Sequence, residues 1–203
     1  RHKRANRAQT RQATLDSLAG VGLSQPQEIA TAYPHQLSGG MRQLAMIAMA
    51  TVCKPSVIIA DEPTTALDAS IRSLVLQQLN KLRERHNTAL LLISHDLSIV
   101  RQVCDDVLVM YCGRVLEQAP CDDLFADPRH PYTAGLLACI PSLANEEAPP
   151  IRSIPGQVPS THDLPPGCHF APRCPRAEEQ CLQSVPEPGI ESTHKVACFR
   201  PLS

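Results

Sequence analysis

Two short, continuous apolar runs separated by a helical stretch constrain the fold of this chain more than any other feature. The runs cover residues 57–60 and 89–93, and residues 70–85 between them carry apolar side chains on one helical face. Such runs are typical of buried parallel strands, because the helices that connect parallel strands cover both faces of the sheet. The order therefore predicts an α/β fold, with a parallel sheet and flanking helices.

Periodicity and turn signals predict the remaining elements. Helices are expected at residues 10–19, 37–49 and 96–103, and a hairpin is expected to join residues 107–111 and 114–117 through a turn at Cys112-Gly113. Residues 141–166 are rich in proline, which indicates an extended surface linker. The segment that follows is too short for a hydrophobic core of its own, and it needs a cross-link such as a bound metal or a disulfide to be stable.

Each apolar run is followed by residues that can coordinate magnesium, polarise a water or contact a phosphate. Asp61 and Glu62 directly follow the first run, and His95 follows the second. Ligand sites of open α/β sheets lie at the carboxyl ends of the strands. There one carboxylate can coordinate Mg²⁺ while the other polarises an attacking water, and a histidine can reach a terminal phosphate. For each residue taken alone, an acidic turn or a surface histidine is the simpler interpretation.

A helix start that carries two glycines precedes the first run. Ser38 is placed to cap the helix at 37–49, and Gly39 and Gly40 open its first turn. Unpaired N–H groups at a helix start attract anions, and glycine lets a phosphate approach the backbone closely. For this segment alone, a plain N-cap with a flexible turn is the simpler interpretation.

The order LSGGMRQ, a strand ending in DEP, then ALD, and a strand ending in SHD resembles the ATP-binding cassette (ABC) ATPases over residues 31–117. The resemblance implies ATP and Mg²⁺ as cofactors. It assigns Ser38, Gly39, Gly40 and Gln43 to the signature motif, Asp61 to the magnesium-binding Walker B position, Glu62 to the catalytic base, Asp68 to the D-loop and His95 to the switch histidine. Leu44 stands where related importers often carry arginine, which predicts a weaker surface contact.

The phosphate loop of that family has no counterpart in this chain. The loop ends in Gly-Lys-Ser/Thr, and none of the nine glycines here is followed by lysine. In the family, the signature motif of one subunit closes over ATP held by the phosphate loop of the other. The chain is therefore expected to be a fragment or truncated subunit that is inactive alone, with an exposed sheet edge and apolar face.

The C-terminal part narrows the resemblance. The segment DPRHPYT at residues 127–133, with the helix after it, resembles the C-terminal extension of oligopeptide, dipeptide and nickel importer ATPases. We therefore predict a partial ABC ATPase domain over residues 1–126. An importer-type extension with a proline-rich linker and a four-cysteine metal module is predicted over residues 127–203.

The nine cysteines form two groups. Five are expected to be ordinary buried thiols: Cys53, Cys104, Cys112, Cys121 and Cys139. The other four, Cys168, Cys174, Cys181 and Cys198, have the spacing C-x5-C-x6-C-x16-C, unlike the paired C-x2-C knuckles of zinc ribbons. Four thiolates on such a loop suit an iron–sulfur cluster, with zinc or free thiols as alternatives. His169 and His194 are further candidate ligands, although the simpler expectation is that both are surface histidines. The resemblance to the dipeptide-importer branch implies a four-iron four-sulfur (4Fe-4S) cluster.

The resemblance implies the ATP-hydrolysing subunit of an importer for peptides or a related solute, such as nickel or glutathione. Its implied partners are a second, distinct ABC ATPase, membrane permease subunits and a solute-binding protein, at the cytoplasmic face of the inner membrane. Two other classes stay open. One is a non-transport ABC ATPase, although the chain has no long heptad insertion. The other is a catalytically incomplete metal-binding regulatory module.

Charge and hydropathy argue against two broad classes. The net charge of −1 is unlike that of a general nucleic-acid binder. No apolar run reaches the roughly 18 residues that a membrane span needs. The basic opening of the chain lacks the serine-rich character of a transit peptide, and it indicates the solvated face of a helix in a chain that begins inside a domain.

Overall fold

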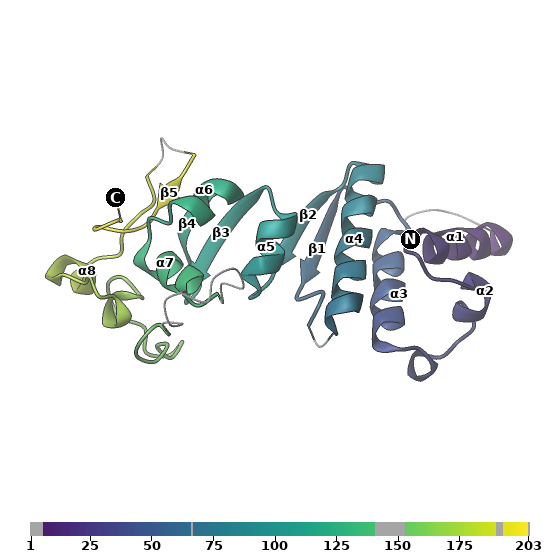
Figure 1. Ribbon diagram of the computed structural model, residues 1–203, viewed down its shortest axis with the longest axis horizontal. Coiled ribbons are helices and arrows are strands. Elements are labelled where there is room, and N and C mark those ends of the chain that lie inside the picture. Colours follow the sequence, from purple (N-terminus) through teal and green to yellow (C-terminus); the bar gives the residue numbers. More distant parts are fainter. Residues whose placement is uncertain (1–5, 66, 141–152, 190–192, 203) are drawn as a thin grey trace, which may run out of the picture. The chain divides into compact units, whose positions relative to one another are not determined.

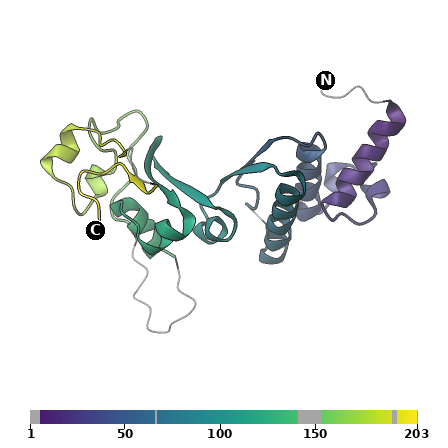
Figure 2. The same ribbon diagram turned by 90° about the horizontal axis from the view of Figure 1, so that it is seen from above.

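The computed structural model of the chain describes residues 6–65, 67–140, 153–189 and 193–202, with the side chain of His86 left out. The chain divides into two compact units, residues 1–95 and residues 96–203. Figures 1 and 2 show the elements of both units.

The described part of the first unit is a helical layer followed by two strands. Its elements are α1 (Arg7–Gly20), α2 (Pro26–Ile29), a short 3-10 turn (Pro34–Gln36), α3 (Gly39–Thr51), β1 (Val57–Asp61), α4 (Ala69–His86) and β2 (Ala89–Ile93). The predicted helices and strands of this region are thus confirmed, with ends that shift by a few residues. The predictions did not include α2 or the 3-10 turn.

Side-chain caps determine where the long helices of the first unit begin. Asn6, Ser38 and Asp68 precede α1, α3 and α4, and each side chain accepts a hydrogen bond from a backbone N–H in the first turn. Such caps satisfy one of the N–H groups that a helix start leaves unpaired. The predicted N-cap at Ser38 is therefore confirmed.

The four helices share one apolar core. It contains Leu18, Val21, Leu23, Ile29, Leu44, Ile47, Ala48, Val75, Leu79 and Leu82. Leu44 is only 4% exposed within this core. The expectation that it stands in a surface contact is therefore wrong, because the α3 face that carries Leu44 packs inward.

The two strands pair in parallel, with Val57 opposite Ala89 and Asp61 opposite Ile93. Burial alternates along β1, so that Ile58 and Ala60 are buried while Val57 and Ile59 are exposed. One face of this sheet is therefore uncovered within the described residues. A parallel sheet is normally covered on both faces, and the expected apolar face is confirmed.

The described part of the second unit contains an antiparallel sheet with short helices. Its elements are α5 (Leu97–Val103), β3 (Asp106–Tyr111), β4 (Arg114–Pro120), α6 (Cys121–Ala126), α7 (Pro131–Ala138), a 3-10 turn (Ala171–Arg173), α8 (Glu179–Gln183) and β5 (Lys195–Val196). The strand order is β3-β4-β5. The predicted hairpin is confirmed: Cys112 and Gly113 both have positive φ, as a tight hairpin turn requires.

The hairpin and the cysteine-bearing region share an apolar cluster. Its buried members are Tyr111, Leu116, Cys168, Phe170, Ala171 and Cys181. A second cluster joins α5 and α6 to the sheet through Val100, Val107, Val109, Ala119, Cys121 and Leu124. The domain boundary expected between residues 126 and 127 rests on family resemblance alone and stays a prediction.

One arginine connects the predicted linker to the hairpin. The Arg173 guanidinium donates to the carbonyl oxygens of Ile154 (2.9 Å) and Pro155 (2.8 Å) and to the Tyr111 hydroxyl (3.3 Å). Residues 153–166 contain no helix or strand, as expected of the linker, whereas residues 141–152 lie outside the described residues.

All nine cysteines are thiols. Of the five expected to be ordinary buried thiols, only Cys121 is buried. Cys53 is exposed because it follows the end of α3, and the other three are partly buried. The prediction for those four is wrong, because an apolar neighbourhood in sequence does not place a residue on an inward face. Within the described residues, no helix is both long enough and apolar enough to cross a membrane.

Candidate functional site

A carboxylate and a histidine meet at the carboxyl ends of β1 and β2. The Nδ1 atom of His95 lies 2.7 Å from the Oε1 atom of Glu62, and the backbone N–H of His95 donates to the same oxygen at 3.1 Å. The backbone N–H of Glu62 in turn donates to the carbonyl of Ile93 at 2.9 Å. Parallel pairing thus brings together two residues that lie 33 positions apart in sequence.

The other carboxylate oxygen of Glu62 is also held. The Thr65 hydroxyl donates to Oε2 at 2.8 Å. The hydrogen bond from His95, followed by that from Thr65, lowers the pKa of the Glu62 carboxyl below its ordinary value. Glu62 has a φ of 47°, a left-handed conformation that non-glycine residues seldom adopt. The site therefore presents an oriented and ionised carboxylate at the end of β1.

Asp61 and Asp68 have different surroundings. Asp61 is the last residue of β1 and its side chain is exposed, so that it is accessible to a cation. Asp68 caps α4: its carboxylate accepts from the Ser70 hydroxyl at 2.6 Å and from the Ile71 N–H at 2.9 Å. These two hydrogen bonds, with that of Ser70 the larger, lower the pKa of Asp68. In this chain Asp68 has a structural role as a helix cap.

The two glycines of the signature segment differ in what surrounds them. A Cβ atom at Gly40 would lie 2.6 Å from the Cγ2 atom of Ile71, whereas the nearest atom to a Cβ at Gly39 is in Leu67, 3.9 Å away. Gly40 is thus required for the close packing of α3 on α4. Gly39 lies in the exposed first turn, where its N–H is open to an anion. Ser38 is exposed, and Gln43 is partly buried on α3.

The structure joins some predicted residues and not others. Glu62 and His95 are in direct contact, and the start of α3 packs against the start of α4. Among the described residues, no hydrogen bond connects Ser38, Gly39 or Gln43 to the Glu62–His95 pair. Thr65, which orients Glu62, was not predicted, although its place three residues after Glu62 in a turn offered a weak signal.

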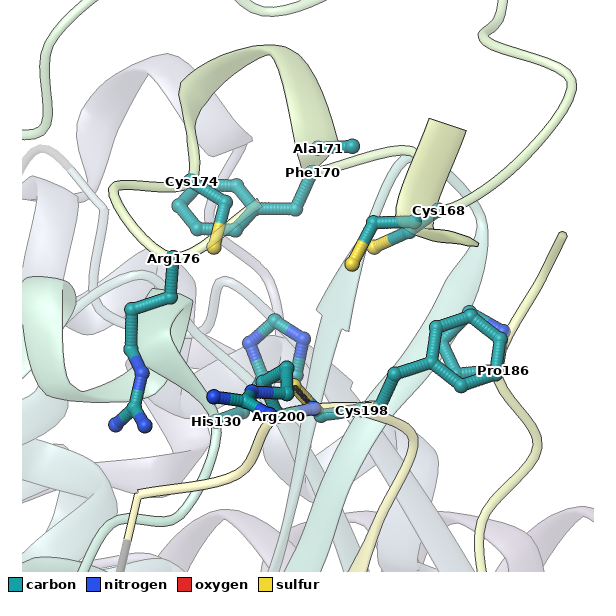
Figure 3. A pocket seen from close by; sticks show the side chains of 11 residues that line it. His130, Cys168, Phe170, Ala171, Cys174, Arg176, Pro186, Cys198 and Arg200 are labelled. Atoms are coloured by element: carbon teal, nitrogen blue, oxygen red, sulfur yellow. Dashed lines mark hydrogen bonds between the residues drawn. The ribbon is translucent and has the colours of Figure 1, made fainter. Parts of the chain in front are cut away.

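Four cysteines of the second unit line one cavity (Figure 3). We call it the thiol cavity: it is lined by Cys168, Cys174, Cys181 and Cys198 together with His130, Phe170, Ala171, Arg176, Pro186, Phe199 and Arg200. The four cysteines come from the two flanks of a 3-10 turn, from α8 and from the segment after β5. The fold thus gathers residues that are spread over 31 positions of sequence.

The sulfur atoms of the thiol cavity are surrounded by apolar groups and by backbone donors. Burial raises the pKa of the Cys168, Cys174 and Cys198 thiols. Each of these sulfurs also accepts from the backbone N–H two residues later, and the Arg200 N–H lies 3.4 Å from the Cys198 sulfur. Such donors stabilise a thiolate once a metal replaces its proton.

Close backbone packing forms the wall of the thiol cavity. The Cys168 N–H donates to the Cys181 carbonyl at 2.8 Å. A Cβ at Gly167 would collide with that same carbonyl, so that only glycine fits there. Among the described residues, no group of three or more His, Cys, Asp or Glu side chains is arranged to hold a single metal ion.

A buried carboxylate beside the thiol cavity was not predicted from the sequence. Glu117 of β4 is fully buried, and it accepts from the Arg129 N–H (2.6 Å), the His130 N–H (3.0 Å) and the Nε2 atom of His194 (2.7 Å). Glu117 therefore connects three segments: β4, the start of α7 and the strand that leads to Cys198. His194, expected at the surface, is buried because it pairs with this carboxylate.

The other candidate histidine ligand does not face the thiol cavity. His169 is buried, and its Nδ1 atom lies 3.1 Å from the carbonyl oxygen of Cys112. It lines a different cavity between the hairpin turn and residues 185–188. The default expectation of a surface position is thus wrong for both histidines.

Comparison with known proteins first shows which protein families the chain resembles. Residues 2–65 match the model of the ABC transporter family, and residues 116–181 match that of the oligopeptide/dipeptide transporter C-terminal region. A solved structure titled as a post-hydrolysis dimer of the ATP-binding cassette MJ0796 with ADP and Pi aligns with a TM-score of 0.51 and 28% identity. It covers 59% of this chain and 50% of that chain. The chain is therefore similar to part of an ABC ATPase domain and, over residues 116–181, to the C-terminal region of oligopeptide/dipeptide transporters.

Individual relatives are similar to this chain over nearly its whole length. The chain is 48% identical to the oligopeptide transport ATP-binding protein AppD of Bacillus subtilis, with 98% of this chain and 60% of that protein covered. It is 43% identical to OppD of Salmonella typhimurium, an oligopeptide transport ATP-binding protein, over 99% of this chain and 60% of the relative. It is 41% identical to the dipeptide transport ATP-binding protein DppD of Haemophilus influenzae, over 100% of this chain and 61% of that relative. The chain thus spans about three-fifths of the length of these relatives.

Proposed function

We propose that this chain is the hydrolytic and closing part of an ATP-binding subunit that drives an ABC importer. The observation that carries the proposal is the Glu62–His95 pair, held at 2.7 Å where β1 and β2 end. An ionised carboxylate there can orient and polarise a water, and the exposed imidazole can contact a terminal phosphate. Asp61, the exposed end of β1, is the proposed contact of the nucleotide's Mg²⁺.

The remaining assignments follow from the segment at the start of α3. The Gly39 N–H, in the exposed first turn of a capped helix, is the proposed contact for a phosphate. Ser38 and Gln43 belong to the same proposed surface, and Gly40 keeps α3 against α4. Asp68 fixes the start of α4 beside this surface. A phosphate loop from elsewhere must supply the nucleotide's cradle, since no Gly-Lys pair is present in this chain.

The proposed cargo is a peptide. The relatives AppD and OppD are named for oligopeptide transport and DppD for dipeptide transport, which supports peptides over nickel or glutathione. The proposed partners are a second ABC ATPase subunit, membrane permease subunits and a solute-binding protein, and the proposed location is the cytoplasmic face of the membrane. The match to the oligopeptide/dipeptide transporter C-terminal region also favours transport over a non-transport ABC ATPase.

ATP hydrolysis by the assembled transporter tests the role of Glu62. In the complete subunit with its partner ATPase and permease, we expect Glu62→Gln to lower the rate by about 100-fold or more, with ATP binding retained. Glu28→Gln, an exposed acid on α2, is the matched control and should leave the rate unchanged. An unchanged rate in Glu62→Gln would show that the catalytic assignment is wrong.

We further propose that the thiol cavity holds a 4Fe-4S cluster. The supporting observation is that four buried or partly buried thiols, three of them with N–H donors to sulfur, line one apolar cavity. In a four-iron cluster each cysteine binds a different iron, which fits four thiols spread around a cavity better than a single zinc ion does. Cys168, Cys174, Cys181 and Cys198 are the proposed ligands. Bound there, the cluster supplies a cross-link between segments that lack a core of their own, and a one-electron redox centre.

Metal analysis of anaerobically purified protein tests the cluster. We expect iron and acid-labile sulfide in near-equal amounts, with broad visible absorbance that is lost in Cys174→Ser and kept in the control Cys53→Ser. Protein with neither iron nor visible absorbance contradicts the cluster, and stoichiometric zinc without iron favours the zinc alternative.

A further inference from the structure

His130, the histidine of the DPRHPYT segment, is buried next to the thiol cavity. Its exposed fraction is 1%. Its Nδ1 atom accepts the backbone N–H of Tyr132 at 3.0 Å, which makes His130 the N-cap of α7. Its own backbone N–H donates to Glu117, so that the residue is fixed both by its main chain and by one ring nitrogen.

The hydrogen bond at Nδ1 determines the tautomer of the ring. Because Nδ1 accepts the Tyr132 N–H, it carries no proton in this arrangement. A neutral ring that accepts at Nδ1 carries its proton on Nε2. His130 thus has one N–H donor that does not take part in capping the helix.

The ring of His130 lines the thiol cavity and lies opposite Cys168 and Cys174 (Figure 3). Within the part of the chain that the structure describes, no hydrogen bond involves its Nε2 atom. The ring also packs against Phe170, with the ring centres 5.8 Å apart. Nε2 is not among the fully buried polar atoms that lack a partner in the described residues, so this N–H group is accessible and can donate to an acceptor in the cavity that the ring lines.

We propose that His130 donates a hydrogen bond from Nε2 to a sulfur atom of the iron–sulfur cluster in the thiol cavity. The inference rests on the cluster proposed above and adds a function for the histidine of the DPRHPYT segment. A hydrogen bond to a cluster sulfur stabilises the reduced, more negative form and raises the reduction potential. Glu117, which holds the His130 backbone, positions the donor.

Two substitutions separate this donor from the helix cap. His130→Asn keeps a side-chain oxygen that can cap α7 but does not reach as far into the cavity. His130→Phe keeps a ring of similar bulk but loses both the cap and the donor. We expect both variants to bind iron as the unchanged protein does, with a midpoint potential shifted to more negative values.

The control is His169→Gln, a change of another buried histidine of the second unit. His169 lines the other cavity, and glutamine keeps a donor for the Cys112 carbonyl. We expect the midpoint potential of this variant to match that of the unchanged protein. A shift in only one of the two His130 variants indicates an effect of the cap or of ring bulk, and it contradicts the proposal.

Iron content of the unchanged protein is read first, because it distinguishes the two possible failures. No iron there overturns the proposed cluster, and this inference with it. Iron with the same potential in both His130 variants overturns this inference alone. If both variants lose iron, pulsed electron paramagnetic resonance of the unchanged, reduced protein labelled with ¹⁵N-histidine decides. A weak coupling to a histidine nitrogen is expected, and its absence contradicts the hydrogen bond.

Discussion

At the scale of single residues, the Glu62 carboxyl should titrate below its ordinary value of 4.5, because His95 and then Thr65 hydrogen bond to the ionised form. A carboxyl whose pKa is lowered by folding stabilises the folded state at pH values above its ordinary pKa. That stabilisation is lost as the pH falls through the lowered pKa. We expect His95→Ala to move the Glu62 pKa upward, and Thr65→Val to move it upward by less. Carboxyl ¹³C NMR measures both changes.

Asp68 provides an internal reference for this titration. Its pKa is also lowered, but by Ser70 and the Ile71 N–H, which neither substitution touches. We expect the Asp68 midpoint to stay constant in His95→Ala and Thr65→Val. A Glu62 midpoint that does not move in His95→Ala would show that the contact between the two side chains is not made in solution.

The buried Glu117 carboxylate provides a residue-scale prediction for the second unit. Glu117→Gln keeps the shape but replaces one acceptor oxygen with an N–H₂ group, which leaves at least one of the three donors to this carboxylate unsatisfied. We expect the free energy of unfolding to fall by about 1–3 kcal/mol. Urea unfolding of the metal-free, reduced chain, followed by tyrosine fluorescence, measures it; Tyr111 and Tyr132 both report on this unit.

The same substitution at an exposed glutamate is the control for Glu117. The side chain of Glu178 is 52% exposed and pairs with Arg200 at 3.2 Å. Because exposed ion pairs contribute little, we expect Glu178→Gln to change the free energy of unfolding by less than about 1 kcal/mol. Equal effects at the two positions would contradict the role assigned to Glu117.

Functional residues that belong to sequence motifs could be predicted. Residues whose role depends on partners far away in the sequence could not. The order of DEP and SHD in the sequence suggested that Glu62 and His95 end neighbouring strands, and the structure brings them together. Nothing local marks Glu117, because its partners lie 12, 13 and 77 positions away. The sequence marks His130 only as part of the DPRHPYT segment, since its burial depends on the packing of Phe170 against it.

At the scale of elements, the packing of α3 on α4 depends on Gly40. A Cβ there would lie 2.6 Å from the Cγ2 atom of Ile71, closer than side chains normally come. We expect Gly40→Ala to lower the free energy of unfolding by about 1–3 kcal/mol through overpacking. At Gly39 the new Cβ would lie 3.9 Å from its nearest neighbour, in Leu67, so Gly39→Ala should not measurably change the free energy of unfolding. Urea unfolding followed by helical circular dichroism gives both values.

A double substitution identifies the cause of the Gly40 effect. Ile71→Ala removes the atom that the new Cβ would meet. We therefore expect Gly40→Ala combined with Ile71→Ala to be less destabilising than the sum of the two single changes. Simple additivity would mean that Gly40 is needed for its backbone rather than for its closeness to α4.

Most long elements could be predicted, because each carries its own pattern. The helices α3 and α4 have caps and an apolar face, and β2 was predicted with the bounds that the structure gives. The two-residue strand β5 was missed. It forms only because Lys195 and Val196 reach the edge of β4, in two pairings 77 and 79 positions apart that no local pattern can show.

At the scale of the whole molecule, an uncovered apolar face dominates the expected behaviour of the chain. Val57, Ile59, Leu91 and Ile93 lie on one face of the β1–β2 sheet and are 47% to 67% exposed. Parallel sheets in stable proteins are covered on both faces, and the net charge of −1 supplies little repulsion between copies. The relatives are longer than this chain, which spans about 60% of their length.

We therefore expect the chain alone to bind a hydrophobic dye and to self-associate as its concentration rises, because the exposed face removes apolar surface from water on contact. Ile59→Lys combined with Leu91→Lys should reduce both effects. Val158→Lys combined with Leu182→Lys is the control, since those exposed residues lie outside the face and both pairs change the net charge from −1 to +1. Dye fluorescence and sedimentation velocity measure the outcome. Equal loss of association in the two double variants would assign the effect to charge, and the uncovered β1–β2 face would no longer explain it.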